Sequence, residues 1–155
     1  MQRAARLCDE LIIGVGDNIR KAYMFSKDER VRLVSAATES LSNTEVLAFD
    51  GLLADFCVEN NVNIILRGVR SAVDARYEQE MAQATYRLCR IPVMFLCAEP
   101  DLIGTSSSVV RTLLALSDRD ISAYVPPSLA QAIAATGVMG GITHTGGTVE
   151  EPPVK

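Results

Sequence analysis

Short apolar runs alternate with amphipathic segments along most of this chain. Each run has the length of a β-strand and ends close to glycine, aspartate or another turn residue. The runs predict strands at residues 10–16, 45–51, 62–68 and 91–98. The third run, VNIILRG, is almost continuously apolar, which is typical of a strand buried on both faces of a parallel sheet.

Segments with helical periodicity fill the intervals between these strands. They predict helices at residues 26–42, 52–61, 72–89, 106–117 and 126–137. Ser26 and Glu29 have the spacing of a capping box at the start of the first of these helices. One stripe of the helix at 72–89 carries Val73, Tyr77, Met81 and Leu88. We expect Tyr77 and Met81 to lie in the core.

The alternation of strand and helix predicts the fold class, a parallel α/β domain with a doubly wound, Rossmann-like sheet. In such sheets, ligands bind beyond the carboxyl ends of the strands. A chain of 155 residues fits one domain of this kind, which we place at residues 1–136. Residues 137–155 are rich in glycine and proline and have little apolar periodicity, and we interpret them as a flexible tail.

Charge and cysteine content narrow the range of functions. The net charge of −4 gives no footprint for nucleic acid, and no run of lysine and arginine suggests a membrane surface. The four cysteines are far apart and the chain has one histidine, so a zinc site is not expected and a reduced, cytoplasmic protein is the simplest interpretation. Asp9 and Glu10 interrupt the N-terminal segment, which excludes an ordinary signal peptide.

Cationic and hydroxyl side chains gather where the predicted strands end. Arg20 and Lys21 follow the first strand, and Arg67 and Arg70 close the third strand on either side of Gly68. After the fourth strand, a turn of sequence GTSSS runs into a helix. Arginine presents a planar fork to phosphate oxygens, and a helix N-terminus favours an anion. The sequence therefore predicts a polyphosphate site at the carboxyl edge of the sheet.

Each of these features also has an ordinary structural explanation. A lone lysine such as Lys21 is commonly a solvated loop residue, and a serine run is commonly a helix cap. Glu78 would ordinarily be solvated or paired with Arg70, one or two helical turns earlier. Because all these groups fall at strand ends, where this architecture places its ligands, we favour a ligand site.

Four segments carry a resemblance to a known family. The run LRGVRSAVDARYEQEMA, the loop KAYMFSKDERVRLV, the turn SSSVVR and the segment DISAYVPPSL resemble, in order and spacing, the bacterial phosphopantetheine adenylyltransferases. The resemblance extends from Arg3 to Ala134, and its most specific part is the pattern R-G-x-R…Y-E. It implies transfer of the adenylyl group of ATP to 4′-phosphopantetheine, with dephospho-coenzyme A and pyrophosphate as products.

The resemblance also implies roles for single residues. Lys21 matches the catalytic lysine that binds the pantetheine phosphate, Arg67 matches an arginine for the same substrate, and Leu53 matches a backbone contact to the pantetheine arm. The residues that match ATP-binding positions are Gly68, Val69, Arg70, Glu78, Leu102, Ile103, Gly104, Thr105, Ser106, Ser107 and Ser108. The family further implies a magnesium ion that bridges the phosphates, no metal ligands from the protein itself, and a homohexamer.

The chain departs from the family pattern at its N-terminus. The family has a first, central strand that leads into a G-x-F-D-P-x-T-x-G-H motif, whose threonine and histidine contact the phosphates, and this sequence has no such segment. In the family's strand order, that strand lies between the strands at 10–16 and 62–68. We therefore expect two halves without their shared hydrogen-bonding partner, and we hypothesise that the sequence is a truncated form. His144, in the tail, is interpreted as a solvated residue and not as a replacement for the motif histidine.

The sequence departs from the family pattern at two further segments, and two alternative functions stay open. The family segment D-F-E-Y-E is DARYE here, and the serine turn reads LIGTSSS, so adenine packing is expected to differ. One alternative is a degenerate, non-catalytic relative that binds nucleotide. The other is a nucleotidyltransferase for another small phosphate substrate, such as nicotinamide mononucleotide or glycerol phosphate. The paired arginines of RGVR, followed by YE, favour phosphopantetheine over that second alternative.

Overall fold

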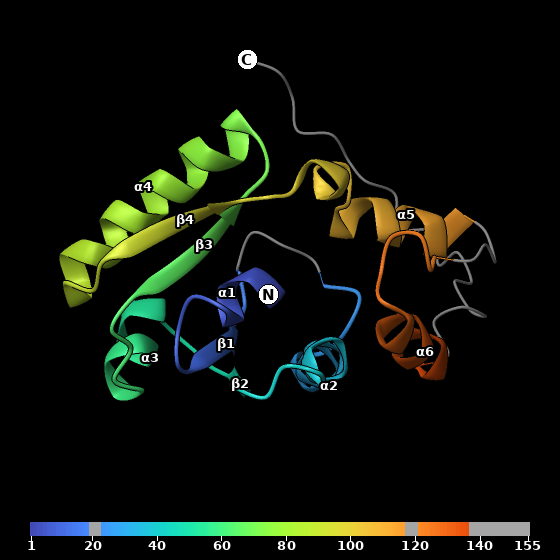
Figure 1. Ribbon diagram of the computed structural model, residues 1–155, viewed down its shortest axis with the longest axis horizontal. Coiled ribbons are helices and arrows are strands. Elements are labelled where there is room, and N and C mark those ends of the chain that lie inside the picture. The colour runs from blue at the N-terminus through green and yellow to red at the C-terminus, as the bar shows by residue number, and fades with distance from the viewer. Residues whose placement is uncertain (19–22, 117–120, 137–155) are drawn as a thin grey trace, which may run out of the picture.

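A computed structural model describes residues 1–18, 23–116 and 121–136 (Figure 1). The strands are β1 (Leu11–Val15), β2 (Thr44–Ala48), β3 (Ile65–Val69) and β4 (Val93–Cys97). The helices are α1 (Gln2–Ala5), α2 (Lys27–Thr38), α3 (Leu53–Glu59), α4 (Ala72–Cys89), the short 3-10 helix η1 (Pro100–Leu102), α5 (Ser107–Leu116) and α6 (Pro127–Ala135). Within these ranges no helix is both long enough and apolar enough to cross a membrane.

The predicted fold class is confirmed, since strands and helices alternate and the strand pairs are parallel. The ladders are two separate two-stranded sheets, in which β1 pairs with β2 and β3 pairs with β4. In the part of the chain that the structure describes, no strand joins the two pairs. In the described residues the two halves are thus two separate ladders.

The backbone direction shows which edges of the strands are free. The Leu11 amide donates to the Asn43 carbonyl on the β2 side, and the Ile65 amide donates to the Pro92 carbonyl on the β4 side. In a parallel strand, alternate residues direct their backbone groups to opposite edges. Thus the backbone N–H and C=O groups of Ile12 and Gly14 in β1 point away from β2. Those of Leu66 and Gly68 in β3 point away from β4 in the same way. We call the edge of β1 that faces away from β2, and the edge of β3 that faces away from β4, the inner edges.

Side-chain packing, rather than backbone hydrogen bonding, joins the two strand pairs. Phe56 and Cys57 of α3 form a buried cluster with Ile65 of β3. Ile12 of β1 and Leu47 of β2 pack against the same cluster, so α3 contacts both ladders. Burial of apolar area of this kind is the main stabilising term in such a domain.

Helix α1 makes a second link between the pairs. In Figure 1 it lies between them, and Nη1 of Arg3 donates to the Cys97 carbonyl at the end of β4 over 2.6 Å. On the other side, Nδ2 of Asn43 donates to the carbonyls of Ala5 (2.8 Å) and Cys8 (3.0 Å) just before β2 begins. The N-terminal turn is therefore tied to both ladders.

A second core lies away from β3 and β4, where α5 and α6 pack on α2 (Figure 1). Its buried members are Leu33, Leu114, Ile121 and Ile133. The chain crosses from β4 through η1 to reach this core. That crossing includes the serine turn, and Thr105 just before it accepts a hydrogen bond from Arg70, beyond the end of β3.

The expectation that Tyr77 and Met81 lie in the core is wrong. Both side chains of α4 are about two-fifths exposed, at 41% and 42%, and Val73 and Leu88 of the same stripe are more exposed still. The buried residue of α4 is Thr85, whose hydroxyl donates to the Met81 carbonyl. The apolar stripe lies uncovered because α4 packs mainly on β3 and α3, which together cover only part of its surface.

Candidate active site

Arg67 of β3 and Glu78 of α4 form a close ion pair. Nε and Nη2 of Arg67 lie 2.6 Å and 2.5 Å from the same carboxylate oxygen, Oε2 of Glu78. Both side chains are mostly buried, with 32% and 20% exposed. The suggested pairing of Glu78 with Arg70 is thus wrong, because the packing of α4 on β3 directs Glu78 toward the strand. Arg67 uses the Nε and Nη2 side of its guanidinium for Glu78. Its Nη1 side therefore faces away from that carboxylate.

Arg70 lies just beyond β3 and has two partners of its own. Its Nε lies 2.7 Å from Oδ2 of Asp74, in the first turn of α4. Its Nη1 donates to the Thr105 carbonyl over 3.2 Å. Arg70 therefore connects the start of α4 with the turn that precedes α5.

A cavity of about 330 Å³ lies beside Arg70. It is lined by Val69, Arg70, Ser71, Ala72, Ala75, Cys97, Ala98 and Ile103. These residues come from the ends of β3 and β4, from the start of α4 and from the segment after η1. A mostly apolar cavity with one cation at its edge suits a flat apolar ring attached to an anionic group.

The serine turn behaves as the predicted helix cap. Oγ of Ser106 accepts a hydrogen bond from the Val109 amide (3.2 Å), the arrangement of an N-cap. Oγ of Ser108 accepts from Nη2 of Arg111 (3.1 Å). Ser107 is the first residue of α5, so its amide belongs to the unpaired first turn, where an anion is favoured.

The remaining predicted residues of this region surround the same corner. Gly68 is exposed, and a Cβ built on it would meet no atom within 4 Å. Leu102 and Ile103 are both 53% exposed. Gly104 likewise has open space at its Cβ position. The surface is thus open at both glycines.

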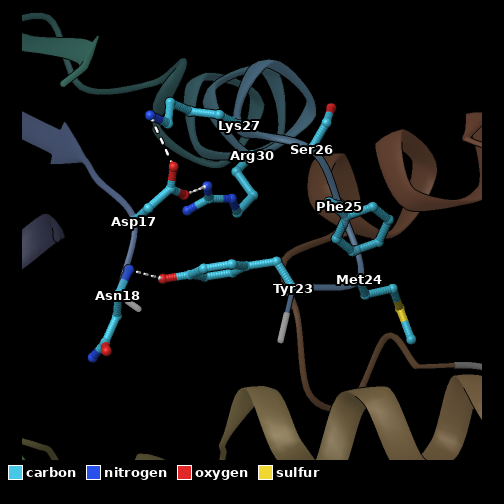
Figure 2. A pocket seen from close by; sticks show the side chains of 8 residues that line it. All are labelled: Asp17, Asn18, Tyr23, Met24, Phe25, Ser26, Lys27 and Arg30. Carbon is cyan, nitrogen blue, oxygen red and sulfur yellow. Dashed lines mark hydrogen bonds and ion pairs between the residues drawn. The ribbon is translucent and has the colours of Figure 1, made fainter. Parts of the chain in front are cut away.

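A second cavity, of about 480 Å³, lies at the carboxyl end of β1 (Figure 2). Asp17 is placed between two cations there, with Nζ of Lys27 at 2.8 Å and the guanidinium of Arg30 on its other carboxylate oxygen. Lys27 also pairs with Asp50, which follows β2. Arg30 donates to the Gly16 carbonyl over 2.9 Å. The site is thus a network that connects the ends of β1 and β2 to the first turns of α2.

This network shifts two pKa values in opposite directions. The hydrogen bond from Lys27 holds the pKa of the Asp17 carboxyl below its usual value. The same bond, aided by Asp50, raises the pKa of the Lys27 ammonium. Both groups therefore stay charged over a wide range of pH, and neither is suited to proton transfer near neutrality.

Aromatic contacts complete this second site. The guanidinium of Arg30 lies 4.0 Å from the centre of the Tyr23 ring, a cation–π contact. The Tyr23 hydroxyl accepts a hydrogen bond from the Asn18 amide (2.5 Å), as Figure 2 shows. Asp17, Tyr23 and Arg30 were not singled out by sequence reasoning. The sequence feature that could have identified this site is the position of Asp17 directly after a predicted strand. A position at a strand end is also what identified Arg67 and Arg70.

Two predicted residues are not among the paired and cavity-lining residues given above. Lys21 lies outside the described residues, as do Arg20 and His144. Leu53 is the first residue of α3 and packs, partly buried, against the Phe56 cluster, so it lines neither cavity. The structure thus brings together Val69, Arg70 and Ile103, with Thr105 bonded to Arg70.

The cations and helix-end amides at this corner are chemically suited to an anion. No group of three histidine, cysteine or acidic side chains able to hold a metal ion occurs among residues 1–18, 23–116 and 121–136. Burial raises the pKa of the Cys57 thiol, which makes it a poor nucleophile. Arginines and helix-end amides remain, and these are suited to binding phosphates and to stabilising charge that develops on them.

Comparison with known proteins identifies the class. Residues 1–113 match the Cytidylyltransferase-like family. The match covers both strand pairs, Arg67 of β3, Arg70 just beyond it, and the serine turn. The chain is therefore a member of the Cytidylyltransferase-like family.

Individual relatives define the family more closely. The phosphopantetheine adenylyltransferase of Thermobifida fusca (strain YX) is 41% identical over 127 residues, which are 82% of this chain and 77% of that protein. That of Lachnoclostridium phytofermentans is 35% identical over 134 residues, 86% of this chain and 82% of the relative. That of Aquifex aeolicus (strain VF5) is 36% identical over 111 residues, 72% and 69%. The chain belongs to the phosphopantetheine adenylyltransferase family.

Proposed function

We propose that this chain transfers the adenylyl group of ATP to the phosphate of 4′-phosphopantetheine, in the synthesis of coenzyme A. The observation that carries the proposal is the corner at the end of β3. There Arg70 donates to the Thr105 carbonyl just before the serine turn, and Arg67 lies in β3. The chain that carries them is 41% identical over 127 residues to a protein of that name. The curated relatives favour neither another phosphate substrate nor nucleotide binding alone.

The reaction needs positioning and charge stabilisation more than it needs a reactive side chain. An oxygen of the pantetheine phosphate forms a bond to the α-phosphorus of ATP, while the bond from that phosphorus to the bridging oxygen breaks. Pyrophosphate leaves with the bonding electrons. No covalent enzyme intermediate forms, and cations fixed around the phosphates lower the barrier.

In this proposal the residues divide between the two substrates. Lys21 and Arg67 bind the pantetheine phosphate, and the backbone of Leu53 contacts the pantetheine arm. The groups that hold ATP are Gly68, Val69, Arg70, Glu78 and residues 102–108. The Arg67–Glu78 ion pair supports a connection between the two sets, because it joins a residue of the first to a residue of the second.

Magnesium enters with ATP as part of the substrate. The described residues offer no carboxylate cluster for a protein-bound ion. This donor set fits an ion that is held by phosphate oxygens and water, as magnesium commonly is at nucleotide sites. When bound, the ion neutralises phosphate charge alongside Arg70 and Lys21.

We also infer self-association, with a homohexamer as the form that the family resemblance implies. Exposed apolar side chains support this, among them Val73 at 81% and Leu88 at 63% on α4, and Met94 at 49% on β4. A net charge of −4 supports small-molecule partners over nucleic acid. The cysteines are free thiols, which supports a reducing, cytoplasmic location. Light scattering coupled to gel filtration tests the oligomer directly.

The test of the activity is pyrophosphate release by the purified chain with ATP, magnesium and 4′-phosphopantetheine. Release that needs phosphopantetheine and falls at least about a hundredfold in Lys21→Ala supports the proposal, because removing one group that stabilises the reacting charge costs on that order. No release from a folded chain contradicts it. ATP binding without release, measured by calorimetry, would assign nucleotide binding alone.

A further inference from the structure

Two groups of the protein itself hold the Arg70 side chain. One is the Asp74 carboxylate and the other is the Thr105 carbonyl. We propose that Asp74 is a positioning residue for ATP, which acts by fixing the plane of the Arg70 guanidinium. The inference rests on the proposed function, since it assigns a supporting residue to the same nucleotide site.

The geometry fixes the guanidinium because the two contacts use different nitrogens. Nε of Arg70 lies 2.7 Å from Oδ2 of Asp74, and Nη1 lies 3.2 Å from the Thr105 oxygen. A guanidinium is rigid and planar, so two contacts at separate nitrogens define the direction of the whole group. Its other N–H donors then remain for the oxygens of a phosphate.

Asp74 is itself held in place. Its amide donates to Oγ of Ser71 over 3.1 Å, the N-cap bond of α4. Its side chain is one-third exposed and that of Arg70 is 42% exposed. The backbone of Asp74 is thus anchored in the first turn of α4, and its carboxylate, through Arg70, links that turn to the segment leading into the serine turn.

The same helix carries a matched ion pair away from the cavity. Arg76 and Glu80 have the same spacing of four residues, with Nε and Oε1 separated by 3.5 Å. Their side chains are 85% and 67% exposed, and neither lines the cavity beside Arg70. Removing the Glu80 carboxylate changes the charge of α4 by the same amount as removing that of Asp74, and it should not affect ATP binding.

The test compares Asp74→Asn with Glu80→Gln in the full chain, with calorimetric titration of ATP and magnesium. We expect Asp74→Asn to weaken ATP binding about fivefold, which corresponds to the upper value for a partly exposed ion pair. Glu80→Gln should leave binding unchanged. Asp74→Glu, which keeps the charge, should recover part of the loss. Unchanged ATP binding in Asp74→Asn would overturn the inference.

Repeating the Asp74→Asn substitution in the Arg70→Ala variant separates positioning of Arg70 from a general effect of Asp74 on α4. In Arg70→Ala, adding Asp74→Asn should cause no further loss, because the carboxylate has nothing left to position. An equal loss in both backgrounds would show that Asp74 acts on α4 itself, and the inference would be wrong. Phosphopantetheine affinity should be the same in Asp74→Asn and in the unmodified chain.

An NMR measurement without ligand tests whether Asp74 holds the Arg70 guanidinium, even if the chain binds no ATP. The Nε–Hε signal of Arg70 should be protected from solvent exchange in the unmodified chain and lose that protection in Asp74→Asn. A signal that is unprotected in both would overturn the positioning role. Failure of every variant, and of the unmodified chain, to bind ATP would contradict the proposed function alone.

Discussion

Gly16 shows at the scale of one residue why some glycines in this chain are structural and others are not. A Cβ built on Gly16 would overlap the ring of Phe49, which stacks on Phe56 at a centroid distance of 4.6 Å. A Cβ built on Gly68 would meet nothing within 4 Å. The first glycine makes room for the core, whereas the second borders open surface at the predicted site.

Gly16→Ala should therefore destabilise the protein by about 1–3 kcal/mol, as overpacking of a core does. Gly68→Ala should change the free energy of unfolding by less than about 1 kcal/mol, because the added methyl group contacts nothing. Urea unfolding of both variants measures the difference. Equal losses in the two would show that Phe49 yields to the added methyl group.

The ion pair of Asp17 and Lys27 makes stability depend on pH at both extremes. The lowered pKa of Asp17 stabilises the fold above about pH 4, and this contribution is lost as the pH falls through the lowered value. The raised pKa of Lys27 contributes below about pH 10 and is lost as the pH rises through the raised value. Asp17→Asn should thus flatten the acid limb of a stability profile measured by urea unfolding. Asp9→Asn, at an exposed position outside this cluster, should leave the limb unchanged.

At the scale of elements, α2 begins with the capping box that the sequence predicts. Oγ of Ser26 accepts from the Glu29 amide, and the Glu29 carboxylate accepts from the Ser26 amide. Ser26→Ala should cost about 1 kcal/mol. Ser35→Ala, at an exposed position of the same helix, should be neutral or slightly stabilising. Thermal unfolding of the two variants measures the difference, and equal melting temperatures would contradict the role of the cap.

Features that depend on residues close in sequence could be predicted from the sequence, whereas features that depend on how distant elements pack together could not. The strand predicted from Val62 begins only at Ile65, because Asn61 has a positive φ of 52° and the Val62 amide turns back to the Cys57 carbonyl. The capping box was predicted because its two residues are three apart. The Arg67–Glu78 pair was not, because it requires β3 and α4 to pack together. The uncovered stripe of α4 was mistaken for core for the same reason.

At the scale of the whole molecule, the two ladders should exchange hydrogen in a distinctive pattern. The inner-edge amides of Ile12 and Leu66 point away from their partner strands, whereas those of Ile13 and Arg67 point toward them. We therefore expect the first two to exchange much faster than the second two, as measured by amide exchange and NMR. Slow exchange at Ile12 and Leu66 would mean that another strand covers the inner edges.

The separate ladders also determine how far the two halves unfold together. Within the described residues they are coupled through the side chains around Phe56 and through the short α1, and not through a shared row of backbone hydrogen bonds. Each half has its own strands and connecting helix, so we expect the two ladders to be coupled less strongly than two strands that share a central neighbour. A ligand that contacts groups following both β1 and β3 would act as a cross-link between them. Its binding would do more than raise the melting temperature, because it would merge two unfolding steps into one.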